Sequence, residues 1–235
     1  MGALIKKIPR TVWVLLGLAA AIYAAWSIAY PSGAWRYRMT VVIETPEGIK
    51  TGSAVREVFA AQGIKLTPES HAVIHARGEA VIVDLGNRGV LFALMRNVSG
   101  PDYSHQIVFN NFSPPHGVAP LSADGIRYYH SLKKGKATLS SDQYPTFVRF
   151  RDPKDSKTVE NVIEMENNGG GGYRIKADHM EEMFGAGVRL KEVTIEMTDE
   201  PVTHGIEKYP LPASERGLYA VPHQLISLDD FQKGD

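Results

Sequence analysis

The chain has 235 residues, carries 26 basic and 26 acidic side chains and so no net formal charge, and contains no cysteine. The lack of cysteine excludes disulfides and thiolate metal sites, and the neutral balance of charge offers no electrostatic attraction for nucleic acid. Fourteen prolines and 22 glycines favour short strands joined by many turns over a helical bundle.

The first predicted element is a membrane helix over residues 11–30, a run without a single charged side chain. A helix of this length spans about 30 Å, the hydrocarbon thickness of a bilayer. Three basic side chains precede the run within residues 1–10, which indicates that the N-terminus is cytoplasmic; they are Lys6, Lys7 and Arg10. We therefore expect a signal anchor in the inner membrane at residues 11–30 and a periplasmic domain at residues 31–235.

Two other interpretations of the same run remain open. A cleaved signal peptide also has a basic start and ends in small residues, which Ser32, Gly33 and Ala34 supply. The apolar run is, however, longer than the roughly 7–15 residues of a signal-peptide core, and bulky Trp26 and Tyr30 lie near the site. A buried helix of a soluble core is the third interpretation, which the position directly behind a basic N-terminal segment disfavours. We favour the anchor.

The folded part begins with a predicted hairpin. Residues 36–44 alternate apolar and polar side chains, which is typical of a half-buried strand. The following Thr-Pro-Glu-Gly at residues 45–48 has the composition of a type I turn. Residues 51–60 are then expected to return as the partner strand.

A second hairpin is expected to form the core of the domain. Residues 71–85 are predicted to form a long strand broken at Gly78, and residues 86–89 turn the chain into a strand at 90–95. The apolar runs in both strands predict that both of their faces are covered. Four side chains are expected to be buried there: Val81, Val83, Leu91 and Phe92.

The middle of the chain gives weaker patterns. Residues 96–121 contain four prolines, which forbid long ladders, and we expect them to be irregular. Residues 145–150 are predicted to form a strand. The Asn-Asn-Gly-Gly-Gly-Gly run at 167–172 predicts a flexible loop.

The C-terminal third contains the clearest strand. Residues 177–184 predict a short helix with Asp178 as its N-cap. Residues 189–197 predict a strand with Val193, Ile195 and Met197 on one face and Glu192, Thr194 and Glu196 on the other. The tail from Pro201 onward is expected to be irregular. The sequence therefore predicts a mainly β (α+β) fold: one antiparallel β-rich domain with one or two short helices after the membrane helix.

Two stretches together resemble a known family. The opening stretch is TPEG…TGSAV within residues 39–58, and the closing stretch is IEMTDEPVT at 195–203 followed by Gly-Ile-Glu at 205–207. They resemble an uncharacterised family of proteobacterial membrane-anchored or exported proteins, whose closing segment is similar to ITDEPVT-GIE. The resemblance implies a Gram-negative source and an envelope location, and it carries over no reaction and no catalytic residue.

The histidines are candidate metal ligands. His71 and His75 would lie roughly 13 Å apart on a strand, too far for a shared metal ion. Loops could gather four other side chains around zinc, namely Asp102, His105, His116 and His130. Their spacing matches no ligand pattern, so we expect no convergence of the histidines, no metal site and no cofactor.

Two further polar clusters have an ordinary structural interpretation. On the predicted helix, Asp178, His179, Glu181 and Glu182 fit a solvated face. After the last strand, Asp199, Glu200 and His204 form a candidate acid–base group or partner-binding rim. Alternatively, Thr198 and Asp199 cap the turn that Pro201 forces, and we favour this structural role.

The sequence therefore predicts a membrane-anchored envelope domain that binds a partner or ligand and is not an enzyme, with no nucleic acid among its partners. The alternative is an envelope hydrolase or metal-dependent enzyme that uses the loop histidines. A third hypothesis makes the chain an assembly subunit whose anchor packs against other membrane helices through small residues such as Gly17, Ala20 and Ala24.

Overall fold

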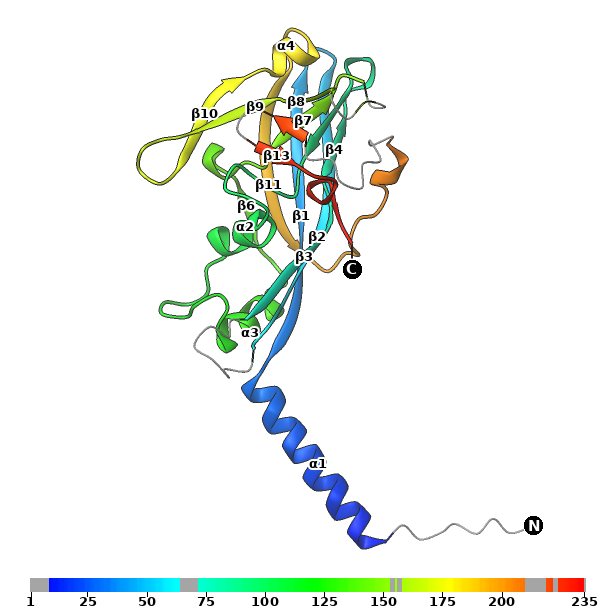
Figure 1. Ribbon diagram of the computed structural model, residues 1–235, viewed down its shortest axis with the longest axis vertical. Helices are drawn as coiled ribbons and strands as arrows, with labels where there is room; N and C mark the ends of the chain where they lie inside the picture. Colours follow the sequence, from blue (N-terminus) through cyan, green and yellow to red (C-terminus); the bar gives the residue numbers. More distant parts are fainter. Residues whose placement is uncertain are drawn as a thin grey trace, which may run out of the picture.

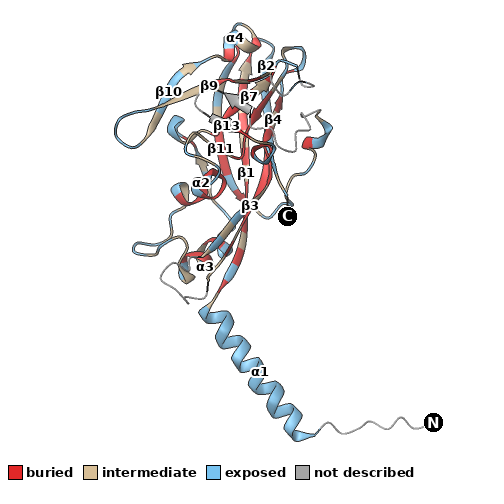
Figure 2. Cartoon of the chain, in the orientation of Figure 1, coloured by how far each residue is buried: buried red, intermediate tan, exposed pale blue. Residues whose placement is uncertain are grey.

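The computed structural model describes residues 9–63, 72–152, 155, 158–209, 219–221 and 224–234. Helix α1 (Arg10–Ala29) projects from one end of an elongated β-rich domain, and none of its residues is buried (Figures 1 and 2). It is long and apolar enough to cross a membrane, as predicted, and its bounds differ from the predicted span by one residue at each end. Lys6 and Lys7 lie outside the described residues.

The first hairpin is confirmed and is longer than predicted. Strand β1 (Ser32–Thr45) pairs with β2 (Gly48–Ala61) over its whole length, from Ser32 opposite Ala61 to Thr45 opposite Gly48. The predicted first strand begins at residue 36, whereas β1 begins at Ser32, because residues 32–35 already pair with the end of β2. The inner face of β1 is almost completely buried: Trp35, Tyr37, Met39, Val41 and Ile43.

The larger sheet has six strands in the order β14-β3-β2-β1-β11-β6, and its pairs are antiparallel. Strands β3 (Val73–Glu79) and β11 (Arg189–Thr198) flank the central hairpin, with β6 (Lys136–Thr138) and β14 (Gln232–Lys233) at the edges. The apolar face of β11 is buried as its alternation predicted. The tail was expected to be irregular, but it supplies β14, because Gln232 pairs with Glu79 on the open edge of β3.

The smaller sheet has the order β4-β5-β7-β8. Its strands are β4 (Val81–Asp84), β5 (Val90–Ala93), β7 (Phe147–Phe150) and β8 (Val159–Asn161). The predicted second hairpin is confirmed, with a 3₁₀ turn η1 (Gly86–Arg88) between β4 and β5. The predicted break falls at Ala80, where the chain leaves the larger sheet and enters the smaller one, two residues after Gly78.

The core lies between the two sheets. Val81, Val83 and Leu91 lie in this core, whereas Phe92 belongs to a second buried cluster on the other face of the smaller sheet. All four side chains are at most 4% exposed, as predicted. The sheets approach closely at Gly52 of β2, because a Cβ atom there would lie 1.9 Å from the carbonyl oxygen of Ile82. A glycine is therefore required at this point of contact.

Two helices cover the rest of the inner face, in the part of the chain expected to be irregular. Helix α2 (Tyr103–Asn111) and helix α3 (Ala123–Ser131) both begin after a proline-containing turn, so the prolines delimit the helices without interrupting them. The ring of Trp35 lies 6.3 Å from that of Phe109 and 5.1 Å from that of Tyr129, centroid to centroid. This aromatic cluster attaches α2 and α3 to the half of β1 that follows α1.

The third short helix of the described domain is α4 (Met180–Phe184). It begins later than predicted, because Ala177 and Asp178 belong to β10 (Tyr173–Asp178) and pair with β9 (Ile163–Asn167). The Asp178 carboxylate still accepts a hydrogen bond from the Met180 backbone N–H, at 2.9 Å. The β9–β10 hairpin projects from the side of the domain (Figure 1), and the predicted glycine loop forms its tip.

The described tail contains four further short elements. They are the 3₁₀ turns η4 (Ile206–Lys208) and η5 (Leu228–Asp230) and the paired strands β12 (Tyr219–Val221) and β13 (Gln224–Ile226). One more 3₁₀ turn, η2 (Ser141–Gln143), lies between β6 and β7. The described part of the tail therefore packs along the edge of the domain.

Replacing Gly52 by alanine should destabilise the domain by about 2–3 kcal/mol, because the new methyl group forces β2 and β4 apart. Chemical unfolding of the full chain in lipid nanodiscs, followed by tryptophan fluorescence, measures the change. Gly170→Ala in the hairpin loop is the matched control, since its Cβ would meet only a side-chain oxygen at 3.5 Å. Equal stabilities of the two variants would contradict the close approach of the sheets.

Phe92→Ala should lower the free energy of unfolding by about 3–5 kcal/mol, because it leaves a cavity among aromatic rings. The Phe92 ring is edge-on to Phe150, Tyr209 and Phe231, with centroids 5.7–6.0 Å away. The same unfolding assay applies, with half-exposed Ile49→Ala as the control. A loss below about 1 kcal/mol would show that this cluster is not part of the packed core.

Candidate functional site

The predicted rim residues Asp199 and Glu200 are held by basic side chains. The Lys133 ammonium contacts the Asp199 carboxylate at 3.0 Å, and the Arg38 guanidinium is paired with Glu200. The backbone N–H of Glu200 also donates to Thr198 Oγ1 at 3.2 Å, as expected of a capped turn. Both carboxylates therefore form ion pairs with side chains of the domain itself.

His204 lies farther along a segment that crosses the larger sheet. The Arg36 guanidinium on β1 donates to the carbonyl oxygens of Asp199 and Glu200, at 3.4 and 3.3 Å. Thr203 then exchanges hydrogen bonds with Val55 on β2, through its N–H and its hydroxyl. The exposed His204 therefore follows after the chain has passed from β1 to β2, and the structure does not join it to the two carboxylates as an acid–base pair.

The segment ends at a buried carboxylate. Glu79, the last residue of β3, is 2% exposed and accepts hydrogen bonds from the backbone N–H groups of Gly205 and Ile206, at 2.9 and 3.0 Å. The chain thus fills the gap that opens where β3 leaves β2. This arrangement gives the TDEPVTHGIE stretch a structural role at the edge of the larger sheet.

The histidines considered as zinc ligands occupy three different environments. His105 is buried on α2 against Phe109, His116 is exposed in the loop after α2, and His130 Nδ1 lies 3.0 Å from the Ala34 carbonyl oxygen. His75 stacks on Phe59, and His71 lies outside the described residues. In the described part of the chain, no three His, Cys, Asp or Glu side chains are grouped so as to hold a metal ion.

The polar residues around α4 form local contacts. His179 Nδ1 lies 2.8 Å from the Glu182 carboxylate, and the Glu181 carboxylate accepts from the Gly187 backbone N–H at 3.1 Å. These distances describe a solvated helix end with its own short-range partners.

A cavity in the described part of the chain lies elsewhere, beside α2. This α2 pocket has a volume of about 470 Å³ and is open to solvent. Four segments line it: the turn at 97–100, the exposed face of α2, the η2 turn at 142–143, and the tip of the β9–β10 hairpin at 171–173. Its size falls within the range of small-molecule sites in proteins.

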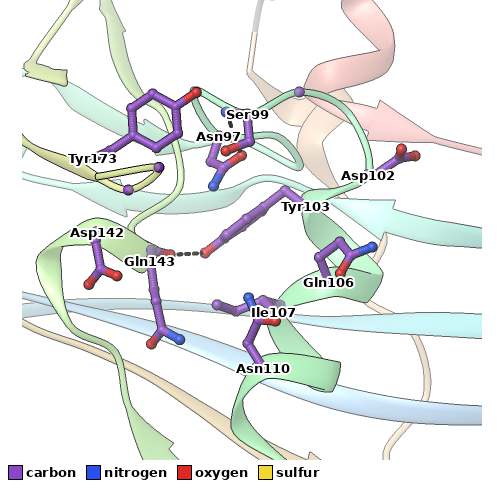
Figure 3. Close-up of a pocket in the computed structure, with 13 residues that line it drawn as sticks. Asn97, Ser99, Asp102, Tyr103, Gln106, Ile107, Asn110, Asp142, Gln143 and Tyr173 are labelled. Carbon is purple, nitrogen blue, oxygen red and sulfur yellow. Dashed lines mark hydrogen bonds between the residues drawn. The ribbon is translucent and has the colours of Figure 1, made fainter. Parts of the chain in front are cut away.

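Polar, mostly uncharged groups line the pocket. Figure 3 shows Gln106 and Asn110 on the α2 side, Tyr173 on the hairpin side, and the amide of Asn97 between them. The helical spacing of four residues places Gln106 and Asn110 on one face of α2. Two carboxylates complete the polar lining, Asp102 and Asp142, and the described lining residues include no lysine or arginine.

Tyr103 joins two walls of the pocket. Its ring crosses the site in Figure 3, and its hydroxyl donates to the Gln143 carbonyl oxygen at 2.9 Å. Burial raises the pKa of the Tyr103 phenol well above its usual value, so this hydroxyl keeps its proton. Tyr103 therefore holds α2 and the η2 turn together and does not act as a base.

Interactions with both sheets fix the position of α2. The Tyr37 hydroxyl on β1 donates to the Ser104 carbonyl oxygen at 2.8 Å, and Ser104 Oγ donates to the Met95 carbonyl oxygen at 2.9 Å. Burial also raises the pKa of the Tyr37 phenol. The pocket wall that α2 forms is therefore attached to β1, whose inner face is almost completely buried.

A histidine and a lysine lie behind the pocket at the start of α2. Burial lowers the pKa of the His105 imidazole, and the nearby Asp102 carboxylate opposes this effect. Burial also lowers the pKa of Lys233, whose ammonium donates to the Pro101 carbonyl oxygen at 3.0 Å and interacts electrostatically with Asp102. Part of the negative charge of Asp102 is thus offset from behind.

The sequence does not predict this site, because its main wall lies within residues 96–121, which were expected to be irregular. One local signal was available: Ile107 and Val108 follow Asp102 at a spacing typical of the first turns of an amphipathic helix. No local signal brings the hairpin tip at Tyr173 to the same place, since about 70 residues separate it from α2.

No protein-family model, curated protein or solved structure matches the chain.

The buried His105 should make the domain less stable in mild acid. Because its folded pKa lies below the unfolded value, the unfolded chain binds a proton first, and stability falls as the pH drops below about 6.5. The melting temperature of the full chain in nanodiscs, measured between about pH 7.5 and pH 5.5, should decline, and His105→Gln should flatten this decline.

The exposed His116→Gln is the matched control and should keep the wild-type slope. If His105→Gln shifts the melting temperature equally at every pH, the imidazole is not the group that titrates.

Proposed function

We propose that this chain is a membrane-anchored protein of a Gram-negative cell envelope, whose periplasmic domain binds a ligand or partner beside the inner membrane without catalysing a reaction. The observation that carries this proposal is the junction of α1 with β1. Only Tyr30 and Pro31 separate the apolar helix from Ser32, which already pairs with Ala61.

This short junction supports a fixed position of the domain at the bilayer. Two residues span at most about 7 Å, so the paired strands begin next to the end of the membrane helix. The Arg127 guanidinium on α3 also donates to the Ile28 carbonyl oxygen in the last turn of α1. The domain is thereby joined to its anchor by the chain itself and by a side-chain contact.

The orientation of the anchor rests on the charges at its N-terminal end. Lys6, Lys7 and Arg10 precede the apolar run, and basic residues are retained on the cytoplasmic side. The TPEG…TGSAV opening and the TDEPVTHGIE closing stretch add the envelope location implied by the family that they resemble. Together these features support a periplasmic domain.

The chemistry of the α2 pocket supports binding in preference to catalysis. The amides of Asn97, Gln106 and Asn110 donate and accept hydrogen bonds but do not exchange protons near neutral pH. The Tyr103 hydroxyl keeps its proton and is committed to the Gln143 carbonyl oxygen. These four side chains can orient a ligand but supply no nucleophile or base. The carboxylates of the lining are Asp142 and Asp102, and the charge of Asp102 is partly offset by Lys233.

Reporter fusions test the topology. Alkaline phosphatase fused after Asp235 should be active, because it folds in the periplasm. Green fluorescent protein fused at the same position should not fluoresce. The intact mass of the purified protein should match an uncleaved chain whose first residue is Met1 or Gly2. A variant with Lys6→Glu, Lys7→Glu and Arg10→Glu serves as the charge control and should lose phosphatase activity.

A fluorescent cytoplasmic fusion after Asp235 would overturn the orientation. A mature N-terminus near Trp35 would show instead that the apolar run is a cleaved signal peptide and that the domain is released from the membrane.

A further inference from the structure

We propose that the α2 pocket binds a neutral saccharide chain. This inference rests on the proposed binding function and adds the chemical class of the ligand. It is carried by the combination of side-chain amides, aromatic rings and charge that the four pocket segments bring together.

The hydrogen-bonding groups of the pocket match those of sugar hydroxyls. A hydroxyl donates one hydrogen bond and accepts two, and the amides of Asn97, Gln106 and Asn110 likewise present both donors and acceptors. The Asn97 Oδ1 atom already accepts from the Ser99 backbone N–H at 2.9 Å, which fixes the orientation of its amide. Gln106 and Asn110 are exposed on one face of α2, so their amide groups are available to a ligand.

The rings of the pocket suit the flat, apolar C–H faces of a pyranose. Tyr173 is half-buried at the start of β10 and lies on the opposite side of the pocket from α2 (Figure 3). A tyrosine offers an apolar ring face together with a polar hydroxyl at its rim. A sugar ring against Tyr173 would keep its hydroxyl groups directed at the amides of α2.

The charge of the pocket disfavours anionic ligands. Asp102 and Asp142 line it, and no lysine or arginine is present among its described lining residues. A phosphate, a nucleotide or a uronic acid would bring its negative charge next to these carboxylates. Lys233 offsets part of the charge of Asp102 from behind, which lowers the attraction for cations and leaves neutral hydroxyl-rich ligands favoured.

The position of the pocket suits an internal segment of a polymer. It lies between α2 and the β9–β10 hairpin, on the flank of the domain and away from the end that α1 enters (Figure 1). Because the pocket is open to solvent, a chain can lie across it without inserting a free end.

Isothermal titration calorimetry of the full chain in lipid nanodiscs tests the proposal. Sugar-headed detergents are omitted, because their head groups would compete for the site. The probes are two neutral hexasaccharides (cellohexaose and chitohexaose), the anionic hexagalacturonate, and spermidine as a cation. At least one neutral hexasaccharide should bind, at least about tenfold more tightly than hexagalacturonate and spermidine.

Single substitutions assign the binding to the pocket. Asn110→Ala should weaken binding of the neutral hexasaccharide about fivefold, as expected for the loss of one or two hydrogen bonds. Asn111→Ala is the matched control: it removes the same side chain from the next position of α2, where the amide donates to the Ile107 carbonyl oxygen and does not line the pocket. Its affinity should stay within about twofold of wild type.

Two further variants test the roles of the ring and of the charge. Tyr173→Ala should weaken neutral binding about tenfold through the loss of apolar contact. Asp142→Asn should improve hexagalacturonate binding about threefold relative to binding of the neutral hexasaccharide, because it removes a repelling charge. A purely structural role of Asp142 would not change the discrimination between the two ligands.

The proposal is overturned if neither neutral hexasaccharide binds, if hexagalacturonate or spermidine binds more tightly, or if Asn110→Ala and Asn111→Ala behave alike. Exclusive binding of spermidine would retain the proposed binding function and reject only the ligand class. Saccharide binding by a protein whose reporter fusions place the domain in the cytoplasm would retain the ligand class and reject the proposed location.

Discussion

The arrangement of this domain depends on one buried guanidinium. Arg56 lies on the inner face of β2 with no exposed surface, where a charge is costly unless its donors find partners. In the described chain Nε and Nη2 have partners and Nη1 has none. Its Nε donates to the Glu79 carbonyl oxygen at 3.0 Å, and its Nη2 donates to the carbonyl oxygens of Ala93 and Leu94 at 3.1 and 3.2 Å. One side chain thereby connects the end of β3 in the larger sheet to the end of β5 in the smaller one.

The local sequence around this residue is adapted to the same contact. Gly78 lies opposite Arg56, has a backbone φ of 132°, and would place a Cβ atom 3.2 Å from both the Cα and Cγ atoms of Arg56. Because only glycine fits here without strain, the chain can pass beside the guanidinium and then leave the larger sheet at Ala80. The break in the strand and the buried charge are two parts of one corner.

The α2 pocket depends on this corner through Tyr37. Tyr37 lies opposite Arg56 in the strand register and holds the first turn of α2 through the Ser104 carbonyl oxygen. The helix therefore presents Gln106 and Asn110 to the pocket from a rigid support, whereas Tyr173 comes from the tip of a projecting hairpin. A ligand between them would contact one wall fixed to the core and one wall carried by a two-stranded arm.

The strands and turns with a local pattern were predictable from the sequence, and the site was not. Alternation and turn composition located both hairpins and β11, and the uncharged run of residues 11–30 located α1, because these signals reside in consecutive residues. The two proline-bounded helices were missed, since prolines next to a short helix look the same as prolines in a loop. Alternation places Arg56 on the same face of β2 as Ala54 and Val58, but only the second sheet, packed over β2, makes this charged residue part of the core. The α2 pocket needs residues 97–100, α2, η2 and the hairpin tip to meet, and only the packing of the two sheets and α2 brings these distant segments together.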